Sequence, residues 1–340
     1  MSSTFQFPTS ARAHSQRIRG RRAAGAAVFA LLATASAGSL ACATCGCTLA
    51  TDWASQGLSA HAGWSADLRY DFYDQDQLRS GTHAVDRDAI AFPADEEIQL
   101  HTVNRNATLS ADYGASDWGA TLQLPWLDRD HTTIDEGETA PSAVRFAEIG
   151  DVRLVGRWLG LSEAQDWGVQ FGLKLPTGRT DVTFDSGPTA GEPLDRGLQP
   201  GTGSTDLLLG AFRFGTFDSE SAANAVDWFG NALVQIPISH DAGFRPGTGA
   251  NLSAGLRWRG LGALVPEAQI NARFEQRESG AEADVANSGA TLVYLSPGVS
   301  WAATARLGVY AFAQVPVYQR VNGLQLEPRW SVSAGVRAAF

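Results

Sequence analysis

The sequence predicts an all-β protein: a single antiparallel transmembrane β-barrel of about twelve strands. From Gly63 onward, apolar and polar residues alternate with period two, so that each segment has one apolar and one polar face. The connections between these segments are alternately long and short, and an export signal precedes them. Such strands leave the mean hydropathy near zero, here −0.13, because each one also carries a polar face.

Composition excludes other classes of protein. No run of about eighteen apolar residues follows the signal region, which excludes a helical membrane protein. The formal charge is −10, and removal of the basic signal leaves about −15, so the chain lacks the basic patches that nucleic-acid binding requires. The 36 glycines and 10 tryptophans suit many strands that are joined by turns.

Residues 1–41 have the pattern of a secretory signal peptide. An apolar stretch over residues 23–40 follows a basic region, and Ser39-Leu40-Ala41 forms a small-x-small cleavage site. The pair Arg21-Arg22 lacks the rest of a twin-arginine motif, so we expect ordinary export in unfolded form. The basic region contains Arg12, Arg17, Arg19, Arg21 and Arg22.

The cysteines lie together in a lead-in segment, residues 42–63, which we expect to be periplasmic or to plug the mouth of the barrel. Cys42, Cys45 and Cys47 have the spacing C-x-x-C-x-C without a following His, which excludes haem attachment. They could form a disulfide with the third cysteine left over or acylated, a redox pair, or a copper or zinc site. We favour a disulfide or acylation of Cys42, and expect no other cofactor.

The barrel itself is expected over residues 64–340. Each predicted strand has about the nine to eleven residues that a tilted strand needs to cross a bilayer. Leu252 and Leu256 lie on one face of the eighth strand, for example, and Ser253 and Arg257 lie on the other. The predicted strands are residues 64–73, 103–113, 118–127, 151–159, 167–175, 205–214, 228–238, 251–259, 265–275, 291–301, 307–318 and 330–340.

The lengths of the connections indicate which end of the barrel faces outward. The connections after the first, third, fifth and ninth strands are long, at residues 74–101, 128–150, 176–204 and 276–290. Those after the second, fourth, eighth and tenth are short, at residues 114–117, 160–166, 260–264 and 302–306. Outer-membrane barrels have long external loops and short periplasmic turns. We therefore expect both chain ends on the periplasmic side.

The last predicted strand has alternating apolar residues and ends on Phe340. It resembles the terminal strand of bacterial outer-membrane barrels, in which a final Phe helps the assembly machinery to recognise the chain. The alternative is an ordinary amphipathic strand.

A polar residue, an apolar residue and a proline recur near the outer end of alternate strands. Alternation turns the polar member inward, which predicts a polar ring that narrows the pore, made of Gln123, Lys174, Gln235 and Gln314. The same register turns Tyr310, Phe312 and Tyr318 inward, as an aromatic lining. The alternative is that proline ends strand pairing where the strands enter the loops.

The first two long connections are rich in Asp and Glu. They could be solvated loops, or they could bind divalent cations, either to bridge lipopolysaccharide phosphates or to draw cations to the mouth of the barrel. No G-x-S-x-G or Walker motif is present, and we predict no enzyme. The remaining catalytic alternative is a protease-like pair of His131 with Asp128 or Asp130.

Three stretches resemble an outer-membrane family named for the meta-pathway of phenol degradation and also described as a transporter family. They are Gly150-Asp151-Val152, Gly172-Leu173-Lys174-Leu175-Pro176-Thr177-Gly178, and Gly201-Thr202-Gly203-Ser204-Thr205-Asp206-Leu207-Leu208-Leu209-Gly210. The resemblance implies a barrel and the passage of hydrophobic or aromatic compounds. Its catabolic label reflects an association with degradation pathways and implies no enzyme activity. The cysteine segment and the acidic first loop are not part of the family motif.

We therefore expect a porin-like channel or transporter for small solutes, hydrophobic or aromatic ones among them, in the outer membrane of a Gram-negative cell. Its expected partners are outer-membrane lipid and lipopolysaccharide, the assembly machinery and the solute, with no nucleic acid. One alternative is a metal- or redox-linked barrel whose cysteine segment binds metal or docks a periplasmic partner. Another is a structural or adhesive barrel that uses its acidic loops.

Overall fold

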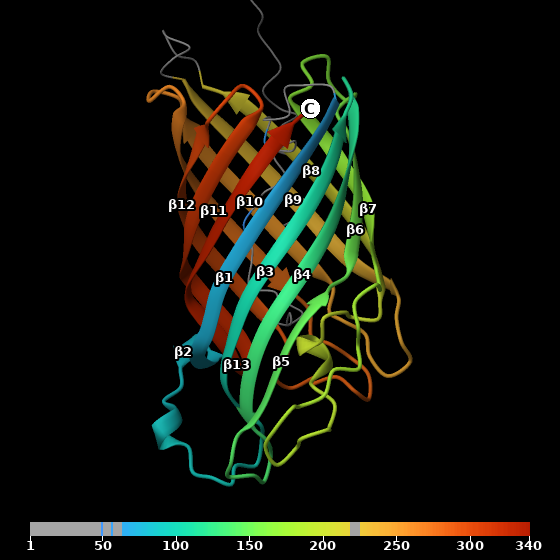
Figure 1. The fold of residues 1–340 in the computed structure, drawn as a ribbon, viewed down its shortest axis with the longest axis vertical. Helices are drawn as coiled ribbons and strands as arrows, with labels where there is room; N and C mark the ends of the chain where they lie inside the picture. Colours follow the sequence, from blue (N-terminus) through green and yellow to red (C-terminus); the bar gives the residue numbers. More distant parts are fainter. Residues whose placement is uncertain (1–48, 50–55, 57–62, 218–224) are drawn as a thin grey trace, which may run out of the picture. The chain divides into compact units, whose positions relative to one another are not determined.

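The computed structural model describes residues 49, 56, 63–217 and 225–340, and most of them lie in antiparallel strands (Figure 1). Two short 3-10 turns, η1 (Arg87–Ala89) and η2 (Arg196–Leu198), lie in the connections. None of the described helices is long and apolar enough to cross a membrane. The strands are β1 (Gly63–Gly81), β2 (His83–Ala84), β3 (Ile98–Gly114), β4 (Trp118–Ile134), β5 (Ser142–Ile149), β6 (Val152–Trp158), β7 (Trp167–Leu175), β8 (Thr205–Thr216), β9 (Val226–Ser239), β10 (Gly249–Trp258), β11 (Leu264–Glu275), β12 (Ala290–Ala302) and β13 (Leu307–Ala339).

The strands close into a barrel because β13 pairs with β12 on one side and with β1 on the other. Among the described residues, 11 of the 13 strands form the closed barrel. The other two lie outside this ring, where β2 pairs with β1 and β5 pairs with β4. β13 is 33 residues long; its first part pairs with β12 and its second part with β1, so this strand crosses the wall twice. The ring therefore has about twelve crossings, the even number that an all-antiparallel barrel requires. The predicted fold class is confirmed.

The strand predictions are accurate inside the apolar belt and too short beyond it. β7 has the predicted bounds, whereas β1 continues to Gly81 and β4 to Ile134. The expectation that residues 74–101 and 128–150 are wholly loop is wrong, since these ranges also contain the start of β3 and all of β5. The period-two pattern ends near Tyr73, where register shifts begin, but β13 continues to pair with β1 beyond that point.

The long and short connections lie at opposite ends of the barrel, as expected. Figure 1 shows the long connections gathered at the end away from the marked C-terminus. At the other end, the backbone N–H of Phe340 donates to the carbonyl of Trp64 at 2.9 Å, which joins the last strand to the first. The end with short turns corresponds to the periplasmic side of outer-membrane barrels.

The two faces of the wall are inverted relative to a water-soluble sheet. Large apolar side chains such as Leu122, Leu252 and Ile270 are exposed on the outside. Polar side chains such as Asn104 and Asn271 are buried on the inside, where hydrogen bonds compensate the cost of removing them from water. An apolar exterior around a hydrogen-bonded polar interior is the arrangement that a lipid environment requires.

Tryptophans mark the edge of the outer apolar belt. The tryptophans beside the short turns are 37–60% exposed, namely Trp64, Trp118, Trp158, Trp167, Trp258 and Trp301. Trp126 and Trp330 are also exposed and lie toward the other edge. On β4, Trp118 and Trp126 are separated by about 26 Å along the strand. This spacing matches the aromatic girdles that flank the apolar band of membrane barrels.

Leu252→Arg tests the lipid-facing assignment of the outer face. Leu252 lies on β10 within the apolar belt, so we expect the variant to lower the free energy of unfolding in lipid vesicles by about 2–4 kcal/mol. The matched control is Leu261→Arg, the same change at an exposed residue of the short turn after β10, which should cost less than about 1 kcal/mol. The free energy of unfolding is measured by urea titration. Equal losses of this free energy in the two variants would contradict the assignment of Leu252 to the lipid-facing side of β10.

Candidate functional site

The interior of the barrel is lined by paired charges. Arg69 on β1 contacts Asp71 at 2.7 Å, and Arg257 on β10 contacts Glu267 on β11 at 3.1 Å. Arg157 on β6 likewise donates to Asp112 on β3, at 2.5 Å. Such pairs are stable away from bulk water only when their hydrogen-bonding groups are satisfied. The lumen is therefore a polar, charged environment.

A cavity of about 240 Å³ lies within this charged interior. Its walls come from inward-facing side chains of β1, β3, β4, β6, β7, β9 and β11, and its roof comes from the connections after β7, β9 and β11. Its lining includes Arg69, Asp71, Tyr73, Gln123, Arg129, Asp151, Arg153, Lys174, Arg196, Pro200, Gln235, Phe244, Arg273, Glu275 and Glu278.

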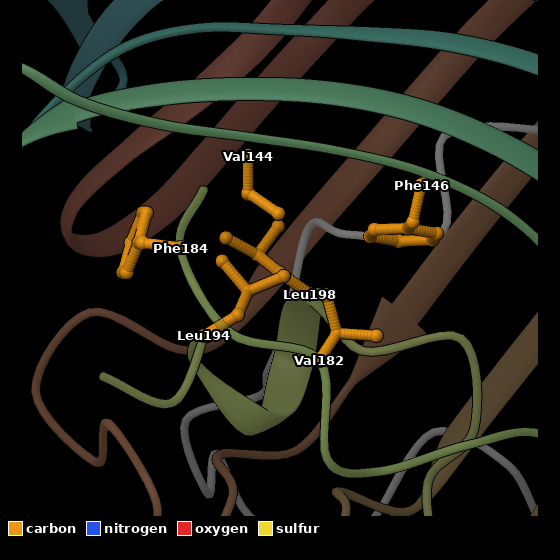
Figure 2. Close-up of a cluster of buried hydrophobic side chains, with 6 residues drawn as sticks. All are labelled: Val144, Phe146, Val182, Phe184, Leu194 and Leu198. Atoms are coloured by element: carbon orange, nitrogen blue, oxygen red, sulfur yellow. The ribbon is translucent and has the colours of Figure 1, made fainter. Parts of the chain in front are cut away.

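The roof is held by a small apolar core that the strand pattern did not predict (Figure 2). Val144 and Phe146 of β5 pack against four side chains of the 176–204 connection: Val182, Phe184, Leu194 and Leu198. Burial of six apolar side chains gives this connection a core of its own. The 176–204 connection is thus a folded cap over the barrel, and we call it the inner loop.

Hydrogen bonds tie the inner loop to the barrel interior. The guanidinium of Arg129, buried on β4, donates to the carbonyl of Leu198 at 2.5 Å and to Oδ1 of Asn104 at 2.8 Å. Gln199 closes the loop on itself, because its amide bonds both the N–H and the carbonyl of Val182 at 2.9 Å. Leu198 thereby lies over the inward face of β4.

The base of the inner loop is fixed by a buried ion cluster. Lys174, the only lysine in the chain, lies 3.0 Å from a carboxylate oxygen of Asp151 and 3.1 Å from one of Asp206. The three side chains are 3%, 7% and 0% exposed, respectively. Asp151 also accepts the backbone N–H of Gly178 at 3.1 Å and that of Thr202 at 3.0 Å. A single carboxylate therefore joins the barrel wall to both ends of the inner loop.

Two glycines allow the ends of the inner loop to meet. A Cβ atom on Gly178 would lie 2.7 Å from Cα of Gly201, and one on Gly201 would lie 2.2 Å from the carbonyl oxygen of Gly178. Thr177 completes the junction, since its hydroxyl donates to the carbonyl of Gly150 and accepts from the N–H of Val152, both at 2.9 Å. The three sequence stretches that suggested a family thus meet at one structural junction.

The structure turns the predicted pore residues inward but does not bring all of them to one place. Gln123, Lys174 and Gln235 line the cavity, and Gln235 hydrogen-bonds Asp206. Gln314 is buried elsewhere on the inner wall, where it donates to Ser331 at 3.0 Å. A single ring of all four residues is therefore not formed around this cavity, and their role in lining a pore stays a prediction.

The predicted aromatic lining is present in part. Tyr310 and Phe312 are buried inside, with ring centroids 6.2 Å apart, and the Tyr310 hydroxyl donates to Asp67 at 3.0 Å. The inward orientation predicted for Tyr318 is wrong. The register shifts by one residue between Pro316 and Tyr318, and Val317 and Tyr318 are 59% and 43% exposed. A one-residue bulge reverses the faces of the strand that follows it.

Two residues of the lead-in segment are described, and both contact the interior. Leu49 packs with Tyr310 and Phe312, and the guanidinium of Arg257 donates to the carbonyl of Gln56 at 3.0 Å. The predicted signal peptide and the cysteines Cys42, Cys45 and Cys47 lie outside the described residues. Copper or zinc binding there stays a prediction.

The catalytic alternative is not supported by the geometry of β4. His131 is buried on the inner face, where its Nδ1 lies 2.8 Å from the hydroxyl of Thr102. Asp128 and Asp130 alternate with it and point to the opposite face, where Asp128 pairs with Arg145 at 3.1 Å. Among the described residues, no group of three or more His, Cys, Asp or Glu could hold a metal ion.

The inner loop holds one acid with a shifted pKa. Asp195 accepts the N–H of Gly197 at 2.8 Å at the start of η2. Burial disfavours its charged form, and Glu97 and Asp284 add repulsion, which together raise its pKa to about 6. The loop thus places one carboxyl group where burial makes its charged form less favourable than in water.

Sequence reasoning missed the acidic partners of Lys174 and the basic residues Arg129 and Arg153. The predicted polar ring did not include them, Arg129 fell in the predicted connection 128–150, and only the folded chain shows that they meet. Asp151 and Asp206 are distant from Lys174 in sequence, and Leu198 is far from Arg129. A charged residue on the inward face of a predicted membrane strand was the available signal.

No family model matches the chain, and no curated protein sequence matches it. Solved structures do match. An outer membrane channel from Pseudomonas putida F1 superposes with a TM-score of 0.52 and 13% identity, over 82% of this chain and 96% of that chain. The β domain of a Bordetella autotransporter gives 0.44 and 14%, over 82% and 100%. The Pseudomonas putida toluene transporter TodX gives 0.42 and 11%, over 86% and 94%. The first match shows an outer-membrane β-barrel fold, and the resemblance to the phenol-degradation family stays a prediction.

Lys174→Met tests the ion cluster at the base of the inner loop. The change leaves Asp151 and Asp206 buried without their cation, so we expect the free energy of unfolding, measured in urea, to fall by about 3–5 kcal/mol. Trypsin cleavage after Arg179, an exposed residue of the loop, should become faster. The double variant Lys174→Met, Asp206→Asn should recover part of the loss. The cluster would be shown not to hold the loop if cleavage stayed at the wild-type rate.

Proposed function

We propose that this protein is an outer-membrane channel that carries small solutes through the lumen of its barrel. The observation that carries the proposal is the polar cavity inside the closed barrel, beneath an inner loop fixed in place by Lys174. A barrel wall with an apolar exterior and a hydrogen-bonded interior supports a location in the outer membrane. Lipid and lipopolysaccharide would surround the outer face, and the assembly machinery would receive the strand that ends at Phe340.

The size and lining of the cavity bear on the kind of solute. At about 240 Å³ it is smaller than the usual pockets for drug-sized ligands, which suits a molecule of a few to about fifteen heavy atoms. Just over half of its lining residues are Arg, Lys, Asp, Glu or Gln, and Tyr73 and Phe244 are its aromatic members. A solute with at least one polar group therefore fits this lining better than a pure hydrocarbon does.

The inner loop is the proposed constriction. Because Gly178 and Gly201 touch, residues 179–200 can be replaced by a short Gly-Ser linker without separating the strands that they join. The junction of Lys174 with Asp151 and Asp206 lies outside the excised range. We expect the wild-type protein to show small discrete conductance steps in a planar bilayer.

The excised variant should conduct several times more current than the wild type, because the roof of the cavity has been removed. The measurement is single-channel conductance of both proteins, refolded and shown to be heat-modifiable on gels. As a control, a Gly-Ser replacement of residues 91–96, in the connection between β2 and β3, should leave the wild-type conductance unchanged, because none of these residues lines the cavity. Absence of conductance from both correctly folded proteins would contradict the channel function.

A further inference from the structure

The cavity wall is richer in cations than in anions. Among the described residues that line it, Arg69, Arg129, Arg153, Lys174, Arg196 and Arg273 carry positive charge, and Asp71, Asp151, Glu275 and Glu278 carry negative charge. This balance is opposite to that of the whole chain, whose formal charge is −10. A small cavity enclosed by low-dielectric walls concentrates such an excess, which favours an anion.

The cationic groups are held in positions where they can act together. In the sheet, Arg153 on β6 lies opposite Gln123 on β4 and opposite Lys174 on β7. Its guanidinium donates to Oε1 of Gln235 at 3.1 Å, across the lumen from β9. Arg273 on β11 is held by Glu275 and by Oδ1 of Asn251, the latter at 3.3 Å. Guanidinium groups with fixed orientation suit the two oxygens of a carboxylate.

The roof of the same cavity contains an apolar patch. Pro200 of the inner loop lines it, together with Phe244 and Pro246 of the connection after β9. The guanidinium of Arg196 stacks over the ring of Phe244, with its carbon 5.0 Å from the centroid, and is anchored by Asp241 at 2.9 Å. The cavity therefore has a cationic wall and an apolar patch in its roof.

We propose that this cavity is a binding site for small organic anions in which a carboxylate is attached to an apolar ring. The carboxylate would contact the wall beside Arg153 and Arg273, and the ring would contact Pro200 and Phe244. The proposal deepens the channel function by naming a class of solute. It is tested by equilibrium binding, so that its failure is distinguishable from a failure to conduct.

The experiment is calorimetric titration of the refolded full-length protein in detergent with benzoate, benzyl alcohol and acetate. Benzoate has both features, benzyl alcohol has the ring without the charge, and acetate has the charge without the ring. We expect benzoate to bind about tenfold more tightly than either of the others, and its affinity to fall as salt is raised. Equal affinity for benzoate and benzyl alcohol would overturn the proposal, as would the absence of benzoate binding to the folded protein.

A matched pair of variants locates the site. Arg153→Gln removes one positive charge from the cavity wall and should weaken benzoate binding about tenfold while leaving benzyl alcohol unaffected. Arg213→Gln removes the same charge from an exposed outer residue of β8, which pairs with Asp166 at 3.1 Å, and should leave benzoate binding unchanged. Phe244→Leu should reduce the preference for benzoate over acetate. Equal weakening of benzoate binding by both arginine variants would place the binding outside the cavity and overturn the proposal.

Discussion

The structure depends on the neutralisation of one buried lysine. The ammonium of Lys174 has almost no access to solvent, so it must be matched by carboxylates and hydrogen bonds within reach. Asp151 and Asp206 supply the charge, and Ser204 accepts a third contact at 3.1 Å. These partners come from the two sides of β7, and Asp151 also holds the backbone at both ends of the inner loop. The Lys174 cluster therefore ties together the strands β6, β7 and β8. It also holds the inner loop in the position where that loop forms the roof of the cavity.

The need to neutralise buried charges also explains which side chains line the rest of the lumen. A barrel in lipid has no water on its outside, so polar side chains gather within and must satisfy one another there. Arg257 and Glu267 do so across the neighbouring strands β10 and β11, and Arg157 of β6 reaches past β4 to Asp112 of β3. The outer face carries the apolar residues and the tryptophan girdle. The cavity is the part of this polar interior that side chains leave unfilled, which is why its lining is charged.

The sequence predicts the membrane-spanning part of this fold well, because alternation with period two is a local property. It correctly turns Gln123, Lys174 and Gln235 inward by parity alone. The prediction fails where contacts between distant residues hold the structure. It misses the outer part of β1, which pairs with β13, the strand β5, and the apolar core that contains Phe146 and Leu198. The prediction that Tyr318 points inward fails for another reason, because a single bulged residue reverses which side chains of the strand face inward. The site needed both kinds of information, inward parity from the pattern and the meeting of Asp151 with Lys174 from the fold.

Hydrogen–deuterium exchange of the wild-type protein in lipid nanodiscs reports whether the inner loop is folded onto the barrel. The amides of Gly178 and Thr202, which donate to Asp151, and of Leu194, which donates to the carbonyl of Val182 at 2.9 Å, are the informative ones. The account predicts that they exchange nearly as slowly as the ladder amides of β7 and β8. Exchange at the rate of an unstructured peptide would contradict an inner loop held by the Lys174 cluster, and with it the cavity beneath.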